Sequence, residues 1–179
     1  MPSPNPQPPT PNPQRIRLLV LDVDGVLTDG AIVLDEQGRE SKRFHVRDGL
    51  GIKLLRDNGV EVAVLSSRSS RAVTLRMAEV GVTRVVQGAA DKAAGLARLL
   101  AEAGVPADQT AYMGDDLQDL PAMHRCAYRM TVADAAKPVR DAADYVTFAP
   151  GGHGAVREAA EHLLRAQHKW RQAIARYES

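Results

Sequence analysis

Short aliphatic runs alternate along the chain with stretches in which apolar residues recur every three or four positions. Six runs have the length and composition of buried strands, at residues 16–21, 60–65, 84–87, 110–113, 127–130 and 145–147. Helical spacing lies between them, most clearly in 91–103 and around Val156, Ala160, Leu163 and Leu164. Strands alternating with helices predict a doubly wound, Rossmann-like α/β fold, in which helices cover both faces of a parallel sheet.

One segment departs from this alternation. Residues 31–34 and 39–46 flank the turn sequence Asp35-Glu36-Gln37-Gly38, which predicts a β-hairpin projecting just after the first strand. Gly59, Gly81 and Gly104 follow predicted helices, where left-handed caps are expected.

The chain of 179 residues has the size of one ordinary domain. Its first fourteen residues contain seven prolines and lack the apolar core of a secretory signal peptide, so we expect a disordered tail over 1–14. Residues 15–179 are then expected to form a single domain, without a cap domain.

Composition removes several function classes. A formal net charge of +1 provides no basic surface for nucleic acid, and 4% aromatic residues are too few for extensive base stacking. No apolar run is long enough to cross a membrane. The single cysteine, Cys126, cannot form an intramolecular disulfide, so we expect a cytoplasmic protein.

Chemistry-bearing residues follow the predicted strands, where parallel sheets bind their ligands. Asp22 and Asp24 follow the first strand, Ser66 the second and Asp115 the fourth, while Lys92 begins the helix after the third. Converging carboxylates repel one another unless a cation neutralises them, and carboxylate and carbonyl oxygens suit Mg²⁺. The pattern predicts a magnesium site formed by Asp22, Asp115 and a backbone carbonyl.

Such a site is suited to phosphoryl transfer. Asp22 can attack phosphorus to give an aspartyl-phosphate, and Asp24 can exchange protons with the leaving group and with water. Gly25 permits the turn behind them. Lys92 neutralises charge, while Ser66 and the first-turn N–H groups of its helix are expected to hold phosphoryl oxygens.

The residues DVDGVLTDG, Ser66, Lys92 and GDDLQD resemble, in that order, the four motifs of the haloacid dehalogenase superfamily of phosphohydrolases. Response-regulator receiver domains gather similar residues around Mg²⁺. In them, however, the hydroxyl and the lysine follow the phosphoacceptor aspartate, whereas here both precede the second acidic pair. Chain order therefore disfavours the receiver interpretation.

The closer resemblance is to the 3-deoxy-D-manno-octulosonate 8-phosphate phosphatases of lipopolysaccharide inner-core sugar synthesis. It covers about residues 15–169 and is carried by FHVRDGLGIKLL, QGAADK, GDDLQDLPAM and GGHGAVRE. The resemblance implies Asp22 as nucleophile, Asp24 as general acid/base, and Mg²⁺ held by Asp22, the Asp24 carbonyl and Asp115. It also implies a substrate site formed by His45, Val46, Arg47, Asp48, Gly49, Lys53, Arg68, Arg76 and Lys92.

Two arginines suit the two anionic ends of a phosphorylated sugar acid. Arg68 and Arg76 are eight residues apart, so we expect one helix face to present both. The family usually has Thr-Gly-Arg where this chain has Ser66-Ser67-Arg68, which leaves the local geometry at Ser67 open.

Other residues have structural interpretations. We expect Asp91 to cap the helix that contains Lys92, and Asp119 to partner Lys92 or backbone groups rather than a metal. Asp116 is left between a supporting role and direct ligation. Cys126 and Met113 are expected in the core.

With only 43 residues between Asp22 and Ser66, no cap domain fits, although phosphoryl transfer benefits from excluding water. We therefore expect a homotetramer, as in the similar family, with a neighbouring subunit covering the site through the hairpin and the glycine-rich segment before the last helix. Two alternative functions stay open: a phosphatase for nonulosonic (sialic-type) acid 9-phosphates, and a non-hydrolytic phospho-signalling module.

Overall fold

Six parallel strands form the central sheet of the protein. The structure is a computed structural model that describes residues 11–178. Their order across the sheet is β5-β4-β1-β6-β7-β8. The strands are β1 (Leu18–Leu21), β4 (Glu61–Leu65), β5 (Arg84–Val86), β6 (Thr110–Gly114), β7 (Tyr128–Thr131) and β8 (Tyr145–Val146). The predicted parallel α/β sheet is confirmed.

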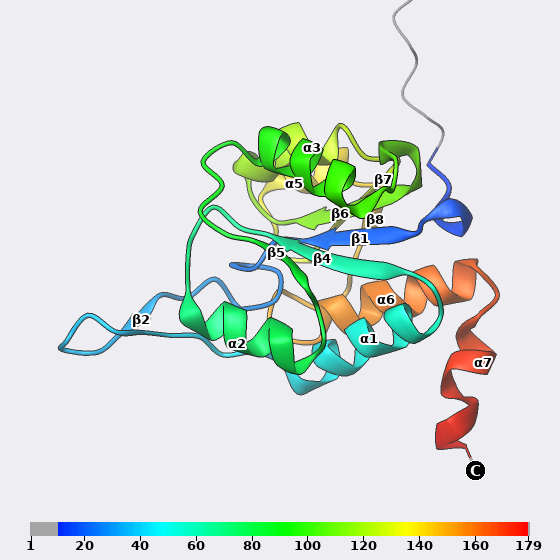
Figure 1. Ribbon diagram of the computed structural model, residues 1–179, viewed down its shortest axis with the longest axis horizontal. Coiled ribbons are helices and arrows are strands. Elements are labelled where there is room, and N and C mark those ends of the chain that lie inside the picture. Colours follow the sequence, from blue (N-terminus) through cyan, green and yellow to red (C-terminus); the bar gives the residue numbers. More distant parts are fainter. Residues whose placement is uncertain (1–10, 179) are drawn as a thin grey trace, which may run out of the picture.

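Helices cover both faces of this sheet (Figure 1). One side carries α1 (Val46–Asp57), α2 (Arg71–Glu79) and α6 (Ala155–Ala166). The other carries α3 (Lys92–Ala103) and α5 (Lys137–Ala142), with α4 (Leu120–Met123) packed beside α3. The chain ends beyond α7 (Trp170–Ile174), and short 3₁₀ helices occupy Pro13–Arg15, Ala107–Gln109, Leu117–Asp119 and Ala175–Tyr177.

The central strands are apolar on both faces because both are covered. All four side chains of β1 are fully buried, as expected for a strand between two helical layers. On one side α1 and α6 approach closely at Gly51, where a Cβ would lie 2.9 Å from the Arg157 Cα. The sheet and its helices therefore form a rigid frame for the loops at the strand ends.

Helix ends follow the predicted signals. The side chain of Asp91 accepts a hydrogen bond from the Ala94 N–H at 3.0 Å, and so caps α3. Gly59, Gly81 and Gly104 have φ values of 82°, 77° and 64°. The expected capping residue and left-handed glycines are confirmed.

The hairpin is shorter than the sequence predicts. It pairs β2 (Val33–Leu34) with β3 (Glu40–Ser41). The prediction of a strand over 39–46 is wrong at its end, because Val46 already begins α1. Phe44 packs against the core and His45 provides the extended residue before the helix, so the chain leaves the hairpin and enters the core before Val46.

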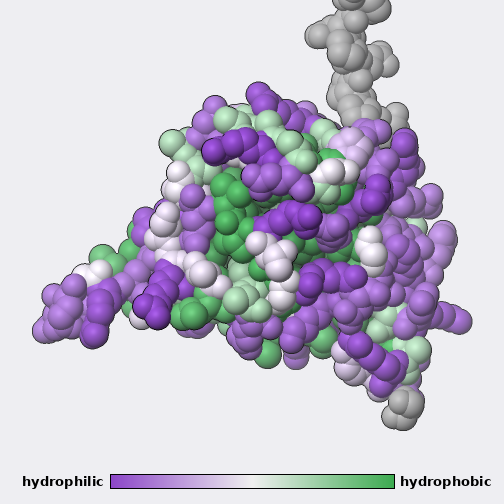
Figure 2. All heavy atoms as spheres, viewed as in Figure 1, coloured by the Kyte–Doolittle hydropathy of each residue, from purple (hydrophilic) through white to green (hydrophobic). Residues whose placement is uncertain are grey.

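The hairpin also carries exposed apolar side chains. Ile32, Val33 and Leu34 are each more than half exposed. Figure 2 shows the hairpin standing out from the body of the protein, with apolar atoms along part of it. This surface is available for contact with another molecule.

The predicted tail, 1–14, lies mostly outside the described residues. Its last part differs from the prediction: Pro13 and Gln14 belong to a 3₁₀ helix capped by Asn12, and the Pro13 carbonyl accepts a hydrogen bond from Gln167 at 3.2 Å. Cys126 and Met113 are buried, as expected. Within residues 11–178, every helix is too short or too polar to span a bilayer.

Candidate active site

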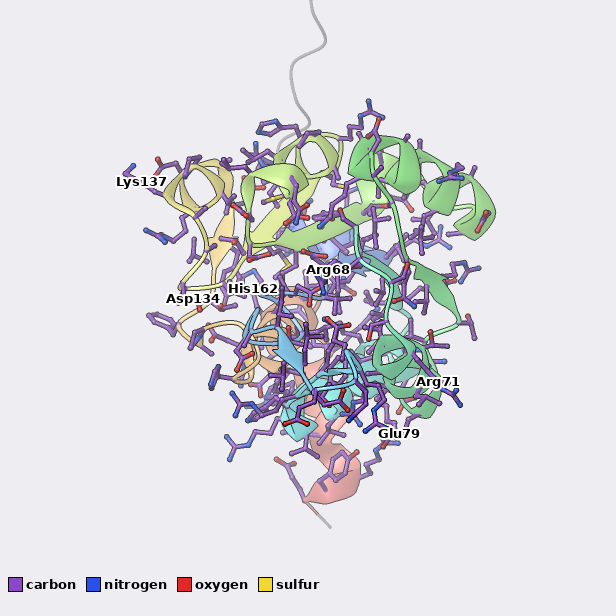
Figure 3. The ribbon with its side chains drawn as sticks, turned by 90° about the vertical axis from the view of Figure 1, so that its left-hand side faces the viewer. Arg68, Arg71, Glu79, Asp134, Lys137 and His162 are labelled. Carbon is purple, nitrogen blue, oxygen red and sulfur yellow. The ribbon has the colours of Figure 1, made fainter. Side chains whose placement is uncertain are left out.

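Three adjacent strands bring their carboxyl ends together at one edge of the sheet, which faces the viewer in Figure 3. Asp22 follows β1, Ser66 follows β4 and Asp115 follows β6, while Lys92 is the first residue of α3. Because β1 lies between β4 and β6, residues distant in sequence become neighbours here.

Lys92 is a buried cation at this edge. Its Nζ lies 2.9 Å from Asp22 Oδ2 and 2.6 Å from Asp119 Oδ1, and all three side chains are at most 2% exposed. Burial of the ammonium opposes its charge, but the two carboxylates more than compensate and raise the pKa of Lys92. Lys92 therefore remains charged and fixes the position of Asp22.

Asp119 is the buried carboxylate that holds Lys92 and the start of the loop after β6. It accepts hydrogen bonds from the Tyr112 hydroxyl at 2.8 Å and from the Asp115 and Asp116 N–H groups at 3.1 and 3.2 Å. The expected partnership of Asp119 with Lys92 and backbone groups is thus seen. The exposed Asp116 caps the 3₁₀ helix after it, which gives this residue a structural role.

Three carboxylates crowd together at the strand ends. Oxygens of Asp22, Asp115 and Asp119 all lie within 4.8 Å of one another. Burial, then repulsion from Asp119, raises the pKa of Asp22 to about 6; burial, then repulsion from Asp22, raises that of Asp115 to about 8. Asp115 Oδ1 is also buried without a hydrogen-bond partner.

These observations fit a divalent cation. Hard oxygen donors suit Mg²⁺, and a cation removes both the repulsion and the unpaired oxygen. Asp22 and Asp115 would hold the ion, together with a backbone carbonyl of the loop that follows β1, which is the ligand set predicted from the sequence. Asp119 is already committed to Lys92 and the backbone.

A first prediction concerns pH. The folded protein holds protons on Asp22 and Asp115 more tightly than the unfolded chain, so the stability that these protons confer is lost as pH rises through about 6 and 8. With EDTA, the melting temperature should fall between pH 6 and 8.5. Saturating Mg²⁺ should reduce the fall, since the ion binds the ionised carboxylates.

Scanning calorimetry with EDTA and with Mg²⁺ measures this effect. The matched variant is Asp115→Asn, which removes the carboxyl group with the higher of the two raised pKa values. In EDTA its melting temperature should change less than that of the wild type between pH 7 and 8.5. Equal slopes for the two proteins would contradict the assignment of the crowded carboxylates.

Glycines allow the loops to approach this closely. Gly25 has φ +90°, and a Cβ there would lie 2.0 Å from Asp115 Oδ2. Gly151 packs in turn on Gly25, with its would-be Cβ 1.8 Å from the Gly25 carbonyl oxygen, and the Gly152 N–H donates to the Val26 carbonyl at 3.0 Å. The glycine-rich segment before α6 therefore packs on the loop after β1 of its own chain.

Asp24 meets residues of the hairpin that the sequence analysis did not identify. Its Oδ1 contacts the Lys42 ammonium, which lies 3.3 Å from Glu40 Oε1. Arg68 Nη2 lies 2.8 Å from the same Glu40 oxygen. The base of the hairpin thus packs on the loop after β1, which contains Asp24, in its own chain. No local pattern distinguished Lys42 from its exposed basic neighbours.

The expected arrangement of Arg68 and Arg76 on one helix face is wrong. The helix α2 begins only at Arg71, because the Ser70 N–H donates to the Gln87 side chain at 2.7 Å and a loop continues from Ser66. In Figure 3, Arg68 lies centrally, apart from Arg71 and Glu79 of α2. For the same reason, the N–H groups beside Ser66 belong to a loop: its Oγ accepts from the Arg68 N–H at 3.2 Å.

The remaining predicted substrate residues form a second group between α1 and α2. Arg76 lines one depression with His45, Asp48 and Gly49, and an adjoining one with Val46, Gly49 and Lys53. Arg47 and Lys53 are exposed.

Asp48 differs from its neighbours in this group. It is buried and accepts a hydrogen bond from the Arg157 N–H at 2.8 Å, which ties α1 to α6. Burial raises its pKa. The structure thus gives Asp48 a role in packing, and the contact with substrate that the resemblance implies stays a prediction.

Comparison with known proteins agrees with this geometry. A family model of haloacid dehalogenase-like hydrolases matches residues 79–156. The 3-deoxy-D-manno-octulosonate 8-phosphate phosphatase of Haemophilus influenzae is 47% identical over 154 residues, 86% of each chain, and that of Escherichia coli K12 is 44% identical, covering 86% of this chain and 82% of its own.

A solved structure is similar over nearly the whole chain. It is the crystal structure of the corresponding phosphatase from Moraxella catarrhalis in complex with a magnesium ion, a phosphate ion and KDO. The TM-score is 0.89 at 38% sequence identity, covering 92% of this chain and 95% of the other.

Proposed function

This chain belongs to the 3-deoxy-D-manno-octulosonate 8-phosphate phosphatases within the haloacid dehalogenase-like hydrolases, and from that premise we propose its reaction. It is a Mg²⁺-dependent phosphomonoesterase that cleaves the 8-phosphate of this sugar acid, releasing the free acid and inorganic phosphate. The observation that carries the proposal is the buried Asp22–Lys92–Asp119 cluster with Asp115 beside it.

In the proposed first step, Asp22 attacks phosphorus. Lys92 holds its carboxylate in place and compensates for the charge of the phosphoryl group. The bond between phosphorus and the sugar oxygen breaks, and the leaving oxygen takes a proton from Asp24. The Ser66 hydroxyl, at the end of the neighbouring strand, supplies a donor to a phosphoryl oxygen.

In the second step, Asp24 removes a proton from water, whose oxygen attacks the phosphorus of the aspartyl-phosphate. The bond to Asp22 breaks, phosphate leaves and the Asp22 carboxylate is restored. Mg²⁺, held by Asp22, Asp115 and the Asp24 carbonyl, supplies charge neutralisation and orientation for the phosphoryl group.

Basic residues around the site suit a doubly anionic substrate. Lys53 and Arg76 line one depression between α1 and α2, and the exposed Arg47 belongs to the first turn of α1. Arg68 approaches the site from the loop after β4. We propose that His45, Val46 and Gly49 contribute backbone or side-chain contacts there. An arginine can bind a carboxylate with two parallel hydrogen bonds.

A substrate panel tests this function. Phosphate release is measured with 3-deoxy-D-manno-octulosonate 8-phosphate, a nonulosonate 9-phosphate and unrelated sugar phosphates, with Mg²⁺ and with EDTA. We expect the octulosonate ester to have the highest kcat/KM and EDTA to abolish turnover. Preference for the nine-carbon ester would favour the alternative substrate, and the absence of any turnover would favour the phospho-signalling module.

We also propose the biological setting that the family suggests: a cytoplasmic homotetramer in lipopolysaccharide inner-core sugar synthesis. The exposed apolar residues of the hairpin support an assembly in which a neighbouring subunit covers the site. Sedimentation that shows an active monomer at assay concentration would contradict this arrangement.

A further inference from the structure

The side chain of Lys42 is buried where the surrounding sequence leads one to expect a solvated residue. Its side chain is 2% exposed, whereas those of Arg39 and Arg43, on either side of it in the hairpin, are 77% and 79% exposed. An ammonium group is rarely withdrawn from water unless carboxylates replace the lost hydration. The partners of Lys42 therefore indicate its purpose.

Two carboxylates replace that hydration, and one of them is the proposed acid/base. The Lys42 ammonium contacts Asp24 Oδ1 and lies 3.3 Å from Glu40 Oε1. For the other oxygen of the acid/base, Asp24 Oδ2, the ion-pair partner among residues 11–178 is the more distant Arg68 Nε, at 4.0 Å. One oxygen of Asp24 is thus tied to the hairpin, and the second is left for proton transfer.

Glu40 fixes Lys42 in turn. The same Glu40 oxygen lies 2.8 Å from Arg68 Nη2, and the Glu40 side chain is 16% exposed. Asp24, Lys42, Glu40 and Arg68 therefore form a chain of alternating charge that joins the hairpin, the loop after β1 and the loop after β4. Alternating charges of this kind hold each member more firmly than an isolated surface pair does.

We propose that Lys42 is a positioning residue for the general acid/base: it holds the Asp24 carboxyl group in the orientation that serves the leaving oxygen. A carboxyl group that rotates freely points away from the leaving oxygen for much of the time. Because proton transfer requires close alignment, small displacements lower its rate. The inference rests on the proposed role of Asp24.

The test uses substituted phenyl phosphates, which carry no sugar and differ mainly in the pKa of the leaving phenol. For each enzyme, log(kcat/KM) is plotted against that pKa under saturating Mg²⁺. Lys42→Met should steepen the negative slope: the poorest leaving groups lose on the order of 10²-fold, the range of general acid catalysis, and the best lose less than about 3-fold. Lys42→Arg should restore most of the wild-type slope.

Two further variants sharpen the result. Glu40→Gln, which weakens the hold on Lys42, should give an intermediate slope. Arg39→Met removes an exposed cation of the same hairpin whose side chain forms polar contacts with Asp35 and Gln37 and, within residues 11–178, with no member of the Asp24–Lys42–Glu40–Arg68 chain, so it should leave the slope unchanged. Circular dichroism and Mg²⁺ titration check that each variant is folded and able to bind the ion.

The possible outcomes are distinct. Equal losses on all phenyl esters, with the slope unchanged, would show a merely structural role for Lys42, and an increased KM for the sugar phosphate alone would show a direct ligand; either overturns the inference. If the wild type cleaves phenyl esters but not the octulosonate ester, the proposed substrate fails and the slopes still decide the role of Lys42. If it cleaves no ester, both proposals fail.

Discussion

Asp22→Asn should lower kcat/KM for the sugar phosphate by at least about 10³-fold, because the amide cannot form the aspartyl-phosphate. The fold should survive the change. At pH 8 the ionised Asp22 is buried against other carboxylates, and its raised pKa of about 6 means that this charge destabilises the metal-free protein. The neutral amide removes that cost, so the melting temperature in EDTA should equal or exceed that of the wild type.

Steady-state kinetics and calorimetry on the same preparation test both parts of this prediction. Asp108→Asn is the matched control, since Asp108 is half exposed and its ion-pair partner among the described residues is Arg15, 3.7 Å away. It should keep wild-type turnover. An Asp22→Asn protein that is folded and still turns over at more than a tenth of the wild-type rate would remove Asp22 from the chemistry.

Gly25→Ala should be nearly as damaging, although it removes no reactive group. The new Cβ would lie 2.0 Å from Asp115 Oδ2, so that the carboxylate or the loop must move. We expect kcat/KM and the affinity for Mg²⁺ each to fall by about 10²-fold, since displacement of about 1 Å is enough for such a loss. Isothermal titration with Mg²⁺ and steady-state assays measure the two effects.

Gly104→Ala separates this clash from backbone strain. Gly104 also has a positive φ, +64°, but in the described part of the chain no heavy atom beyond its immediate neighbours in sequence lies within 4 Å of its would-be Cβ. Its replacement should cost about 1 kcal/mol of stability and leave activity and Mg²⁺ affinity unchanged. Similar losses of Mg²⁺ affinity in both variants would show that close packing at Gly25 is unimportant.

Much of the fold could be predicted from the sequence because β1 and most of β4, at the centre of the sheet, are continuous aliphatic runs. The first strand, for example, is buried on both faces, so its pattern is unambiguous. The hairpin was harder. In its second arm, residues 39–46, only Phe44 and Val46 are apolar, and the contacts of Phe44 with the core and the start of α1 at Val46 decide where the strand ends.

The site could be predicted where chain order alone brings residues together. Asp22 and Asp115 each follow a strand, and the two strands are neighbours in the sheet, so a topological rule sufficed. Lys42 and Tyr112 were missed because their roles depend on tertiary contacts. The buried hydroxyl of Tyr112 needed a partner, but only the structure identifies Asp119 as that partner.

The error at Arg68 has a different origin. Periodicity places Arg68 and Arg76 on one face only if a single helix contains both, and sequence spacing cannot show where that helix begins. The hydrogen bond from the Ser70 N–H to the Gln87 side chain keeps the preceding residues in a loop. Arg68 is thereby directed to Glu40 of the hairpin, and Arg76 to the depression beside Gly49.

The central claim is that Asp22 carries the phosphoryl group during turnover, and chemical trapping tests it most directly. The enzyme is mixed with substrate and Mg²⁺, quenched within one turnover and treated with borohydride, which reduces an acyl phosphate to an alcohol. Peptide mass spectrometry should then find homoserine at position 22, dependent on substrate. Complete turnover with Asp22 unmodified, or with the modification at another carboxylate, would contradict the account.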